Sequence, residues 1–228
     1  MPARRPEKFE GSRFGRLGFP RVLRPILKSE QSTALVYRVA DDVKFWEGSC
    51  PPVEDVRPGQ CPRCGAGARA QGRQVIVGHG VVERQRLGPS GPGAAPEVAG
   101  LRVRRYRCRA CRHVMRVTHS ALLRCKHYGA AAIAMALGLW GIERMAAERV
   151  RELVSPWQQR DPSGSRWRSL ARWAEGAARG ALWQSVSTGL GGMARSIAER
   201  CARLLAAQAS TLGGGLRSQL CAAAEHAR

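Results

Sequence analysis

Two short stretches set the architecture of this chain: Cys61-Pro62-Arg63-Cys64-Gly65 and Cys108-Arg109-Ala110-Cys111. In each, two cysteines flank a two-residue spacer, and this spacing makes a tight turn that directs both thiolates toward one point. Gly65 tolerates the positive φ that such a turn often needs. Two turns together supply four thiolates, which is the ligand set of a closed tetrahedral site.

The long segment between the two turns has the pattern of a β-hairpin. Its β-prone stretches are Gln74 to Val82 and Leu101 to Tyr106, and a Gly/Pro/Ala-rich loop from Gly88 to Gly100 separates them. We therefore predict a zinc ribbon over residues 61–126, with a long loop at residues 88–100.

Metal binding is the use of the four paired cysteines that this spacing favours. An all-thiolate site has no open coordination position, so the ion would be structural, and a hairpin with so small a core would depend on it for folding energy. Chance C-x-x-C pairs and redox dithiols are the alternatives. The predicted ligands of a structural Zn²⁺ are Cys61, Cys64, Cys108 and Cys111.

Other cysteines and histidines are not needed for that site. Cys125 and His127 follow the second turn closely enough to replace a ligand, but the set of four is complete without them. We expect the two remaining ribbon histidines on the surface and the isolated cysteines as small buried hydrophobes. These residues are His113 and His119, and Cys50, Cys201 and Cys221.

The charge balance points to a polyanionic partner. The chain of 228 residues carries 38 Lys and Arg against 17 Asp and Glu, a formal net charge of +21. Nucleic acid or an anionic membrane surface would neutralise such a charge. Nearly all of it is arginine, whose planar fork matches phosphates and guanine edges. The alternative cause is a GC-rich genome, which favours arginine and alanine everywhere.

The second half of the predicted ribbon concentrates this charge. No acidic residue lies between Glu97 and Glu143. We predict that the arginines of this segment contact a phosphate backbone, with Tyr106 adding a stacking contact; the alternative is that they only solubilise a small domain. The predicted contacts are Arg102, Arg104, Arg105, Arg107, Arg109, Arg112 and Arg116.

The chain after residue 126 is alanine-rich and helical in pattern. Helices are predicted over Tyr128 to Trp140, Arg144 to Val154 and Ser165 to about Ala178, giving a helix-turn-helix-like domain over residues 127–180. The third helix has an apolar stripe opposite a basic face, so we expect it to enter the DNA major groove. Its predicted contacts are Arg166, Arg168, Ser169, Arg172 and Arg179. The long connection before this helix leaves a plain helical bundle as the alternative.

The fold class expected is therefore α+β, a zinc-ribbon β-hairpin domain followed by an all-α domain. Residues 1–30 are predicted to be a flexible basic arm, residues 31–60 a short strand at Ala34 to Val39 with a linker, and residues 181–228 further helices. The apolar run Gly129 to Ile142 is too short to cross a bilayer and is expected to be a buried helix. With no signal-peptide pattern, we expect a cytoplasmic protein with no membrane partner.

A resemblance adds to these patterns. It is carried by both cysteine turns, by Arg104-Arg-Tyr-Arg before the second turn and by Arg116-Val-Thr-His-Ser after it, and further on by Val150 to Trp157 and Arg166 to Trp173. Over residues 55–180 the chain resembles bacterial zinc-ribbon proteins associated with transposable elements, which are similar to the N-terminal DNA-binding parts of insertion-sequence transposases. The resemblance implies metal binding by the cysteines and DNA recognition by the helices.

The chain departs from a transposase in one respect. No set of three spaced carboxylates among β-strands follows, so we expect no enzyme but a DNA-binding accessory protein or transcriptional regulator. DNA is the expected partner, RNA a possible one, and a second copy of the chain or a recombinase a further candidate. The alternative function is a zinc-stabilised protein- or RNA-interaction module of a larger complex.

Overall fold

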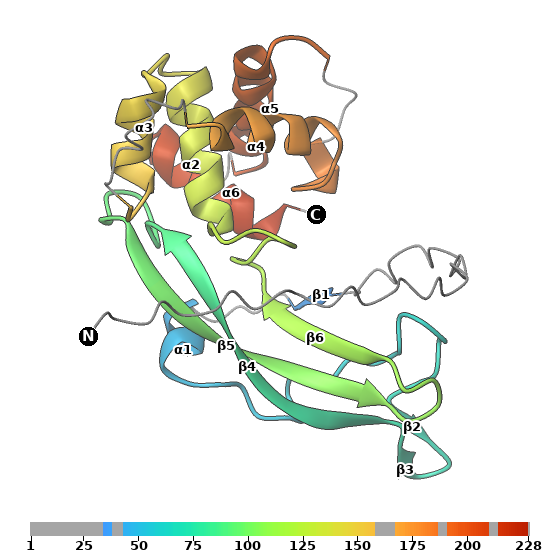
Figure 1. The fold of residues 1–228 in the computed structure, drawn as a ribbon. Helices are drawn as coiled ribbons and strands as arrows, with labels where there is room; N and C mark the ends of the chain where they lie inside the picture. The colour runs from blue at the N-terminus through green and yellow to red at the C-terminus, as the bar shows by residue number, and fades with distance from the viewer. Residues whose placement is uncertain (1–33, 38–42, 158–166, 187–190, 210–213, 228) are drawn as a thin grey trace, which may run out of the picture. The chain divides into compact units, whose positions relative to one another are not determined.

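Antiparallel strands precede a group of helices, which confirms the mixed α+β class predicted from the sequence (Figure 1). The computed structural model describes residues 34–37, 43–157, 167–186, 191–209 and 214–227. The predicted basic arm of residues 1–30 and the predicted contact Arg166 lie outside these ranges.

A four-stranded sheet forms the first half. Its strands are β4 (Ile76–Gly88), β5 (Glu97–Cys108), β6 (Val114–His119) and β1 (Ala34–Tyr37), in the spatial order β1-β6-β5-β4. The β4–β5 and β5–β6 pairs are antiparallel, whereas β1 lies parallel to β6. A separate two-stranded hairpin is made by β2 (Arg69–Ala70) and β3 (Arg73–Gln74).

The β4–β5 hairpin is longer than predicted, and its loop is shorter. Gly88 pairs with Glu97 and Gln85 with Gly100, so all four residues 97–100, which were expected in the loop, belong to β5. Of these four residues only Val98 has high β propensity, but strand pairing uses backbone groups, which every residue supplies. A Cβ at Gly100 would lie 2.4 Å from Oε1 of Glu83, so a larger residue there would require the Glu83 carboxylate to move aside.

A short helix occupies the stretch that was expected to be a linker. Helix α1 (Val43–Gly48) carries Trp46, whose side chain is fully buried. The indole packs edge-on against His119 with ring centroids 5.6 Å apart. His119 is therefore buried, and the prediction that it lies on the surface is wrong. The helix that covers it is distant in the sequence and has no pattern that would have indicated the contact.

The chain after α1 runs along β5 and is held to it by three side chains. The Cys50 thiol donates to the Arg102 carbonyl (3.5 Å), Arg104 Nε to the Pro51 carbonyl (2.5 Å) and the Tyr106 hydroxyl to the Val53 carbonyl (2.7 Å). Tyr106 is fully buried, so the predicted stacking contact with nucleic acid is wrong. Arg104, a predicted phosphate contact, is half-buried and also serves to anchor this segment.

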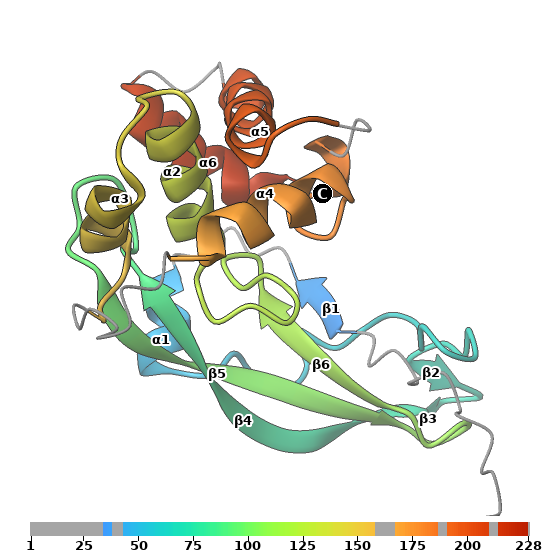
Figure 2. The same ribbon diagram turned by 45° about the horizontal axis from the view of Figure 1, so that its top comes forward.

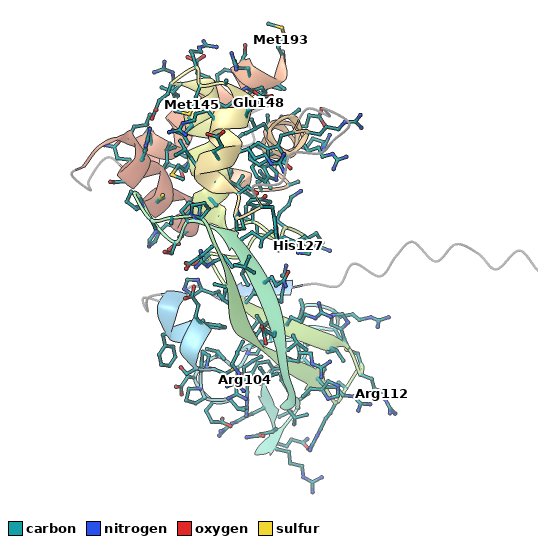
Figure 3. The ribbon with its side chains drawn as sticks, turned by 60° about the vertical axis from the view of Figure 1, so that its left-hand side comes forward. Arg104, Arg112, His127, Met145, Glu148 and Met193 are labelled. Carbon is teal, nitrogen blue, oxygen red and sulfur yellow. The ribbon has the colours of Figure 1, made fainter. Side chains whose placement is uncertain are left out.

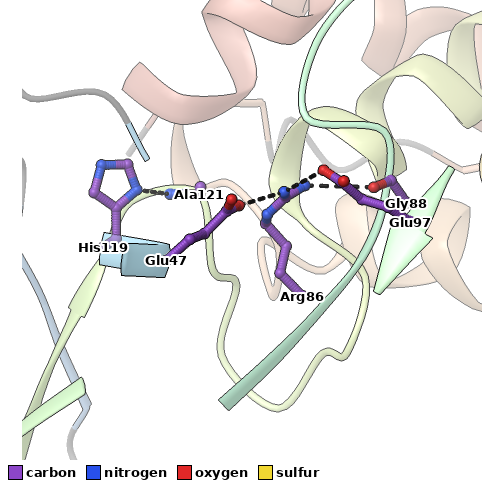
Figure 4. A network of polar contacts seen from close by, with 6 residues as sticks. All are labelled: Glu47, Arg86, Gly88, Glu97, His119 and Ala121. Carbon is purple, nitrogen blue, oxygen red and sulfur yellow. Dashed lines mark hydrogen bonds and ion pairs between the residues drawn. The ribbon is translucent and has the colours of Figure 1, made fainter. Parts of the chain in front are cut away.

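A buried arginine ties α1 to the far end of the hairpin (Figure 4). Arg86 on β4 is 2% exposed and donates to Glu47 of α1 at 2.6 Å, to Glu97 of β5 at 3.0 Å and to the Gly88 carbonyl at 3.4 Å. Two carboxylates and a carbonyl compensate the cost of burying this charge.

The helical half is built around α2 (Ala130–Gly141). Of its 12 residues 11 are buried, so the helix is buried on every face. This confirms the buried helix predicted from the apolar run. Around α2 pack α3, α4, α5 and α6 (Figures 1 and 2). Their bounds are Ala147–Val154 for α3, Ser169–Ala178 for α4, Ala194–Gln208 for α5 and Leu216–His226 for α6, with a 3₁₀ turn η1 at Gln184–Val186.

The two halves meet where the hairpin ends beside the start of α2. Leu87 N–H donates to the His127 carbonyl (2.8 Å), and Gly129 N–H donates back to the Leu87 carbonyl (3.0 Å). Tyr128 then packs edge-on against Trp173 of α4. The opposite end of the sheet carries the cysteine turns, away from the helices (Figure 1). Within the described ranges, no helix combines the length and apolarity that crossing a bilayer requires.

Candidate metal centre

The two cysteine turns have the same backbone geometry. In the first, Cys61 N–H donates to the Ala66 carbonyl at 2.8 Å; in the second, Cys108 N–H donates to the His113 carbonyl at 2.9 Å. Each bond spans five residues and closes a loop around its cysteine pair. The first turn leads into the β2–β3 hairpin and the second joins β5 to β6, so strand pairing positions both.

The four thiols converge as predicted. The sulfur atoms of Cys61, Cys64, Cys108 and Cys111 all lie within 4.8 Å of one another. Sγ of Cys61 is 3.6 Å from Sγ of Cys111, and Sγ of Cys64 is 3.7 Å from Sγ of Cys108. Tetrahedral zinc with Zn–S bonds of about 2.3 Å requires sulfur atoms about 3.8 Å apart. The positions of the four sulfur atoms fit one tetrahedral metal ion. Each of the two close sulfur pairs has one cysteine from the first turn and one from the second.

The ionisation of these thiols shows why a cation suits the site. Burial raises the pKa of Cys61, but hydrogen bonds from the backbone of Cys64 and Arg63 and from the neighbouring thiols outweigh it and lower the pKa to about 7. A backbone hydrogen bond from Ala66 lowers the pKa of Cys64, yet the neighbouring thiols together with desolvation raise it to about 12. One thiolate therefore forms readily, and its negative charge opposes ionisation of the next thiol. A divalent ion would compensate the negative charge of several thiolates at once.

One residue after each cysteine pair, the backbone turns into the left-handed region. Gly65 has φ +70° and Arg112 has φ +61°. The first position is a glycine, for which this conformation has no steric cost, whereas the second carries an exposed arginine and is strained. The expected role of Gly65 is confirmed, and the strain at Arg112 has no counterpart in the sequence pattern.

The remaining cysteines take no part in the cluster. Cys201 and Cys221 are buried in the helical half, where burial raises their pKa values to about 12 and about 11, as expected for small hydrophobes. Cys50 is only half-buried, and Cys125 is exposed.

The ribbon arginines predicted to contact nucleic acid gather on β5, β6 and the second turn. Arg102, Arg109, Arg112 and Arg116 are exposed, and Arg105 and Arg107 are half-buried. Because side chains alternate along a strand, Arg105 and Arg107 share one face of β5. Arg116 of β6 lies directly opposite Arg105 in the sheet register. Figure 3 shows Arg112 at the end of the sheet that is remote from the helices.

The arginines of the helical half are in a different electrostatic setting. Several pair with glutamates at 2.6 to 4.0 Å. These pairs are Arg144–Glu199, Arg149–Glu152, Arg179–Glu175, Arg203–Glu199 and Arg217–Glu143. No carboxylate of the described residues is ion-paired with Arg105, Arg107, Arg109, Arg112 or Arg116. Arg109 donates to a neutral group, the Gln74 carbonyl. These five ribbon arginines thus form one group without an ion-paired carboxylate among the described residues, and Arg168 and Arg172 of the helical half also lack one.

Helix α4 has the amphipathic character predicted for it. Leu170, Trp173 and Ala174 are buried, while Arg168 and Arg172 are exposed on another face. Arg179 is exposed as well and lies 4.0 Å from Glu175, and Ser169 is half-buried. Helices α3 and α4 each pack on α2 and hardly touch each other among the described residues. The helix-turn-helix arrangement stays a prediction.

Some neighbours of the second cysteine turn could not be found from the sequence. His79 on β4 shares a pocket with Arg107, Arg109 and Arg112, although no sequence spacing links it to them. Arg69 and Arg73 of the β2–β3 hairpin are exposed and follow the first turn closely in the sequence. This closeness could have indicated that they lie near the cysteine cluster.

Comparison with known proteins adds no relative: no protein-family model matches the chain, and neither a curated protein nor a solved structure is significantly similar to it.

Proposed function

We propose that this protein is a nucleic-acid-binding protein that uses a structural zinc ribbon to present an arginine surface to DNA. The observation that carries the proposal is the uneven compensation of charge. Five arginines of the helical half are ion-paired with glutamates, whereas no described carboxylate is ion-paired with the arginines of β6, of the second cysteine turn or of the end of β5, where Arg105 lies directly opposite Arg116. A phosphate backbone would supply the missing negative charge.

The metal would stabilise the strands and turns that carry this arginine surface. The ribbon core is small, and two of its buried members, Cys61 and Cys108, are themselves thiols of the cluster. A zinc ion bound by four thiolates would link the turn that follows α1 to the turn between β5 and β6, and so fix the strands that carry the arginines. With four protein ligands the ion would have no open position, so its role would be structural and not catalytic.

The helical half would add recognition of bases. Exposed Arg168, at the N-cap of α4, and exposed Arg172 within α4 have the spacing of one helix face, and arginine makes bidentate contacts with guanine in the major groove. The context we infer is an accessory protein of a mobile element or a transcriptional regulator, on the strength of the resemblance stated above. A protein- or RNA-interaction module is the competing assignment.

A salt titration tests the proposal. Binding of the zinc-loaded chain to a DNA duplex is measured by fluorescence anisotropy at several salt concentrations, for the parent and for Arg105→Gln and Arg116→Gln. We expect the slope of log K against log salt to fall by about 1 for each variant, because each removes one phosphate contact. The matched control is Arg203→Gln in α5. Arg203 is ion-paired with Glu199, which keeps its second ion pair, with Arg144, in this variant.

Three outcomes would overturn the assignment to DNA. A flat slope for the parent would leave only a protein-binding module. Equal slopes for all variants would remove the ribbon from the interface. Tighter binding to an RNA of the same length and charge would assign the surface to RNA.

A further inference from the structure

A pocket of about 400 Å³ lies beside the second cysteine turn, and its lining is almost entirely cationic or imidazole. Val77 and His79 come from β4, Arg107 from β5, and Arg109 and Arg112 from the turn. We call these five residues the arginine pocket. No carboxylate is among them.

Strand pairing brings these residues together. Val77 is the register partner of Arg107, and His79, two residues on, falls within the irregularity between Gly78 and Val81. Bulges of this kind redirect side chains and are common next to binding sites. Arg109 donates from Nη1 to the Gln74 carbonyl at 3.4 Å, which steadies its guanidinium and leaves its other N–H groups available.

The backbone at Arg112 gives an independent reason to assign a role to this pocket. Its φ of +61° would suit glycine, which the first turn has at the equivalent position, Gly65. An arginine here costs roughly 1 kcal/mol or more in strain. The gain is a third guanidinium that reaches a pocket already lined by two.

We propose that the arginine pocket binds one phosphate group of a nucleic acid. Three guanidinium groups offer charge-assisted, bidentate hydrogen bonds to phosphate oxygens, and the imidazole of His79 offers a further donor. The pocket exceeds the volume of a phosphate group, so it admits a phosphate that stays attached to a chain. This inference rests on the proposed function and names the place on the ribbon where a phosphate is held.

The pocket would depend on the metal. Arg109 lies between two of the clustered cysteines, Cys108 and Cys111, and Arg112 follows the second directly. Loss of the ion would release the turn and separate the guanidinium groups. Phosphate and metal would therefore stabilise each other's sites.

The test uses inorganic phosphate as the probe on the zinc-loaded full chain, at constant ionic strength. Resonances of the His79 ring and the Arg109 and Arg112 amides are followed by NMR. We expect saturable shifts at these positions. In Arg112→Gly we expect phosphate affinity to fall at least about tenfold while the melting temperature rises, because the guanidinium is lost and the strain is relieved. Arg203→Gln should bind phosphate as the parent does.

A structural role for Arg112 would give the opposite pattern, with lower stability and unchanged phosphate binding, and would overturn the proposal. Absence of saturable shifts in the parent would do the same. Arg107→Gln serves as a second variant, since it keeps the turn intact and should also weaken phosphate binding. If neither variant changes the affinity, the pocket is not the site.

Two duplexes, alike except for a 5′-phosphate, separate the sources of the phosphate group. If the two duplexes compete equally well with inorganic phosphate, the pocket binds a phosphate of the internal backbone. If the 5′-phosphorylated duplex competes better, the pocket binds the end of a strand. If neither duplex competes, the pocket is not a nucleic-acid site. If long duplexes still bind with a steep salt slope in that case, the proposed function stands and only the pocket fails. If inorganic phosphate binds but duplexes do not, the proposed function fails and an anion site remains.

Discussion

Arg105 of β5 and Arg116 of β6 lie directly opposite each other in the antiparallel sheet. Like charges at such positions are about 5 Å apart at their Cβ atoms and destabilise the sheet. Two residues on, Arg107 lies opposite Val114 of β6 and Val77 of β4, so neither neighbouring strand places a carboxylate opposite it. A surface arranged in this way is costly for the free protein and favourable for the complex with a polyanion.

The first prediction follows from that pair. Replacing Arg116 with threonine removes the repulsion and introduces a residue with high β propensity, so the free protein should become more stable by about 0.5 kcal/mol. Chemical denaturation measures this change. The same variant should bind duplex DNA more weakly, with a salt slope lower by about 1. Lower stability together with unchanged DNA binding would show that Arg116 is a structural residue.

The second prediction concerns the metal. Cys108→Ser removes one of four ligands and a buried member of the ribbon core, so the variant should lose the ion and the ribbon should unfold. Native mass spectrometry gives the metal content, and far-ultraviolet circular dichroism should retain the helical signal, because the helices have a core of their own. Cys125→Ser, at an exposed thiol outside the cluster, is the control and should keep one ion per chain. A full metal complement in Cys108→Ser would contradict the ligand assignment.

The third prediction concerns Tyr106, whose hydroxyl donates to the Val53 carbonyl in a fully buried position. Tyr106→Phe should lower stability by about 1 kcal/mol through the lost hydrogen bond. Burial raises the pKa of Tyr106 to about 12, with Arg104 opposing the shift. The folded state thus holds this proton more tightly than the unfolded chain does, whose tyrosine titrates near 10.

The sign of the pH effect follows from that difference. The contribution of the neutral hydroxyl is complete below pH of about 10 and is lost as pH rises through about 12. The parent should therefore lose more stability than Tyr106→Phe over this interval, as measured by denaturation at each pH. Parallel curves for the two proteins would contradict a buried, hydrogen-bonded phenol.

The cysteine cluster could be predicted from the sequence, because its signal is local. Each C-x-x-C turn brings two thiolates together whatever the rest of the chain does, and four such ligands need only one common point. Trp46 shows the opposite case. Its helix has six residues in a charged, proline-containing stretch, and its burial depends on the distant strand residue His119. No local pattern encodes that contact.

The alternation of side chains along β5 does not divide the strand into one buried and one exposed face. Leu101 and Val103 are buried on one face, and Tyr106 is buried on the other, because the segment that follows α1 covers that face further along the strand. A strand with both faces partly covered does not follow a single alternation. His79 likewise joined the pocket through strand pairing alone.

The fourth prediction concerns the crossing of α2 and α5. A Cβ at Gly141 would lie 2.4 Å from the backbone nitrogen of Glu199 and 2.7 Å from its Cα, so neither helix can yield without moving its backbone. Gly141→Ala should destabilise the protein by about 1–3 kcal/mol, although alanine is the better helix former. Gly59→Ala is the matched control, since nothing lies within 4 Å of a Cβ there. Equal stability of the two variants by thermal denaturation would contradict this close helix contact.

The last prediction tests base recognition by α4. Arg168 and Arg172 are exposed on a helix whose other face is buried, which is the arrangement of a helix that enters a groove. If they contact guanine, the double variant Arg168→Ala/Arg172→Ala should lose about 1–3 kcal/mol per contact on a selected target sequence, and much less on a scrambled duplex. The target is first selected from random duplexes with the parent, and both affinities are measured at one salt concentration. Arg200→Ala, an exposed arginine of α5, should leave the ratio of the two affinities unchanged. Equal losses on both duplexes would assign α4 to phosphate contact, because a contact that ignores sequence cannot distinguish the selected duplex from the scrambled one.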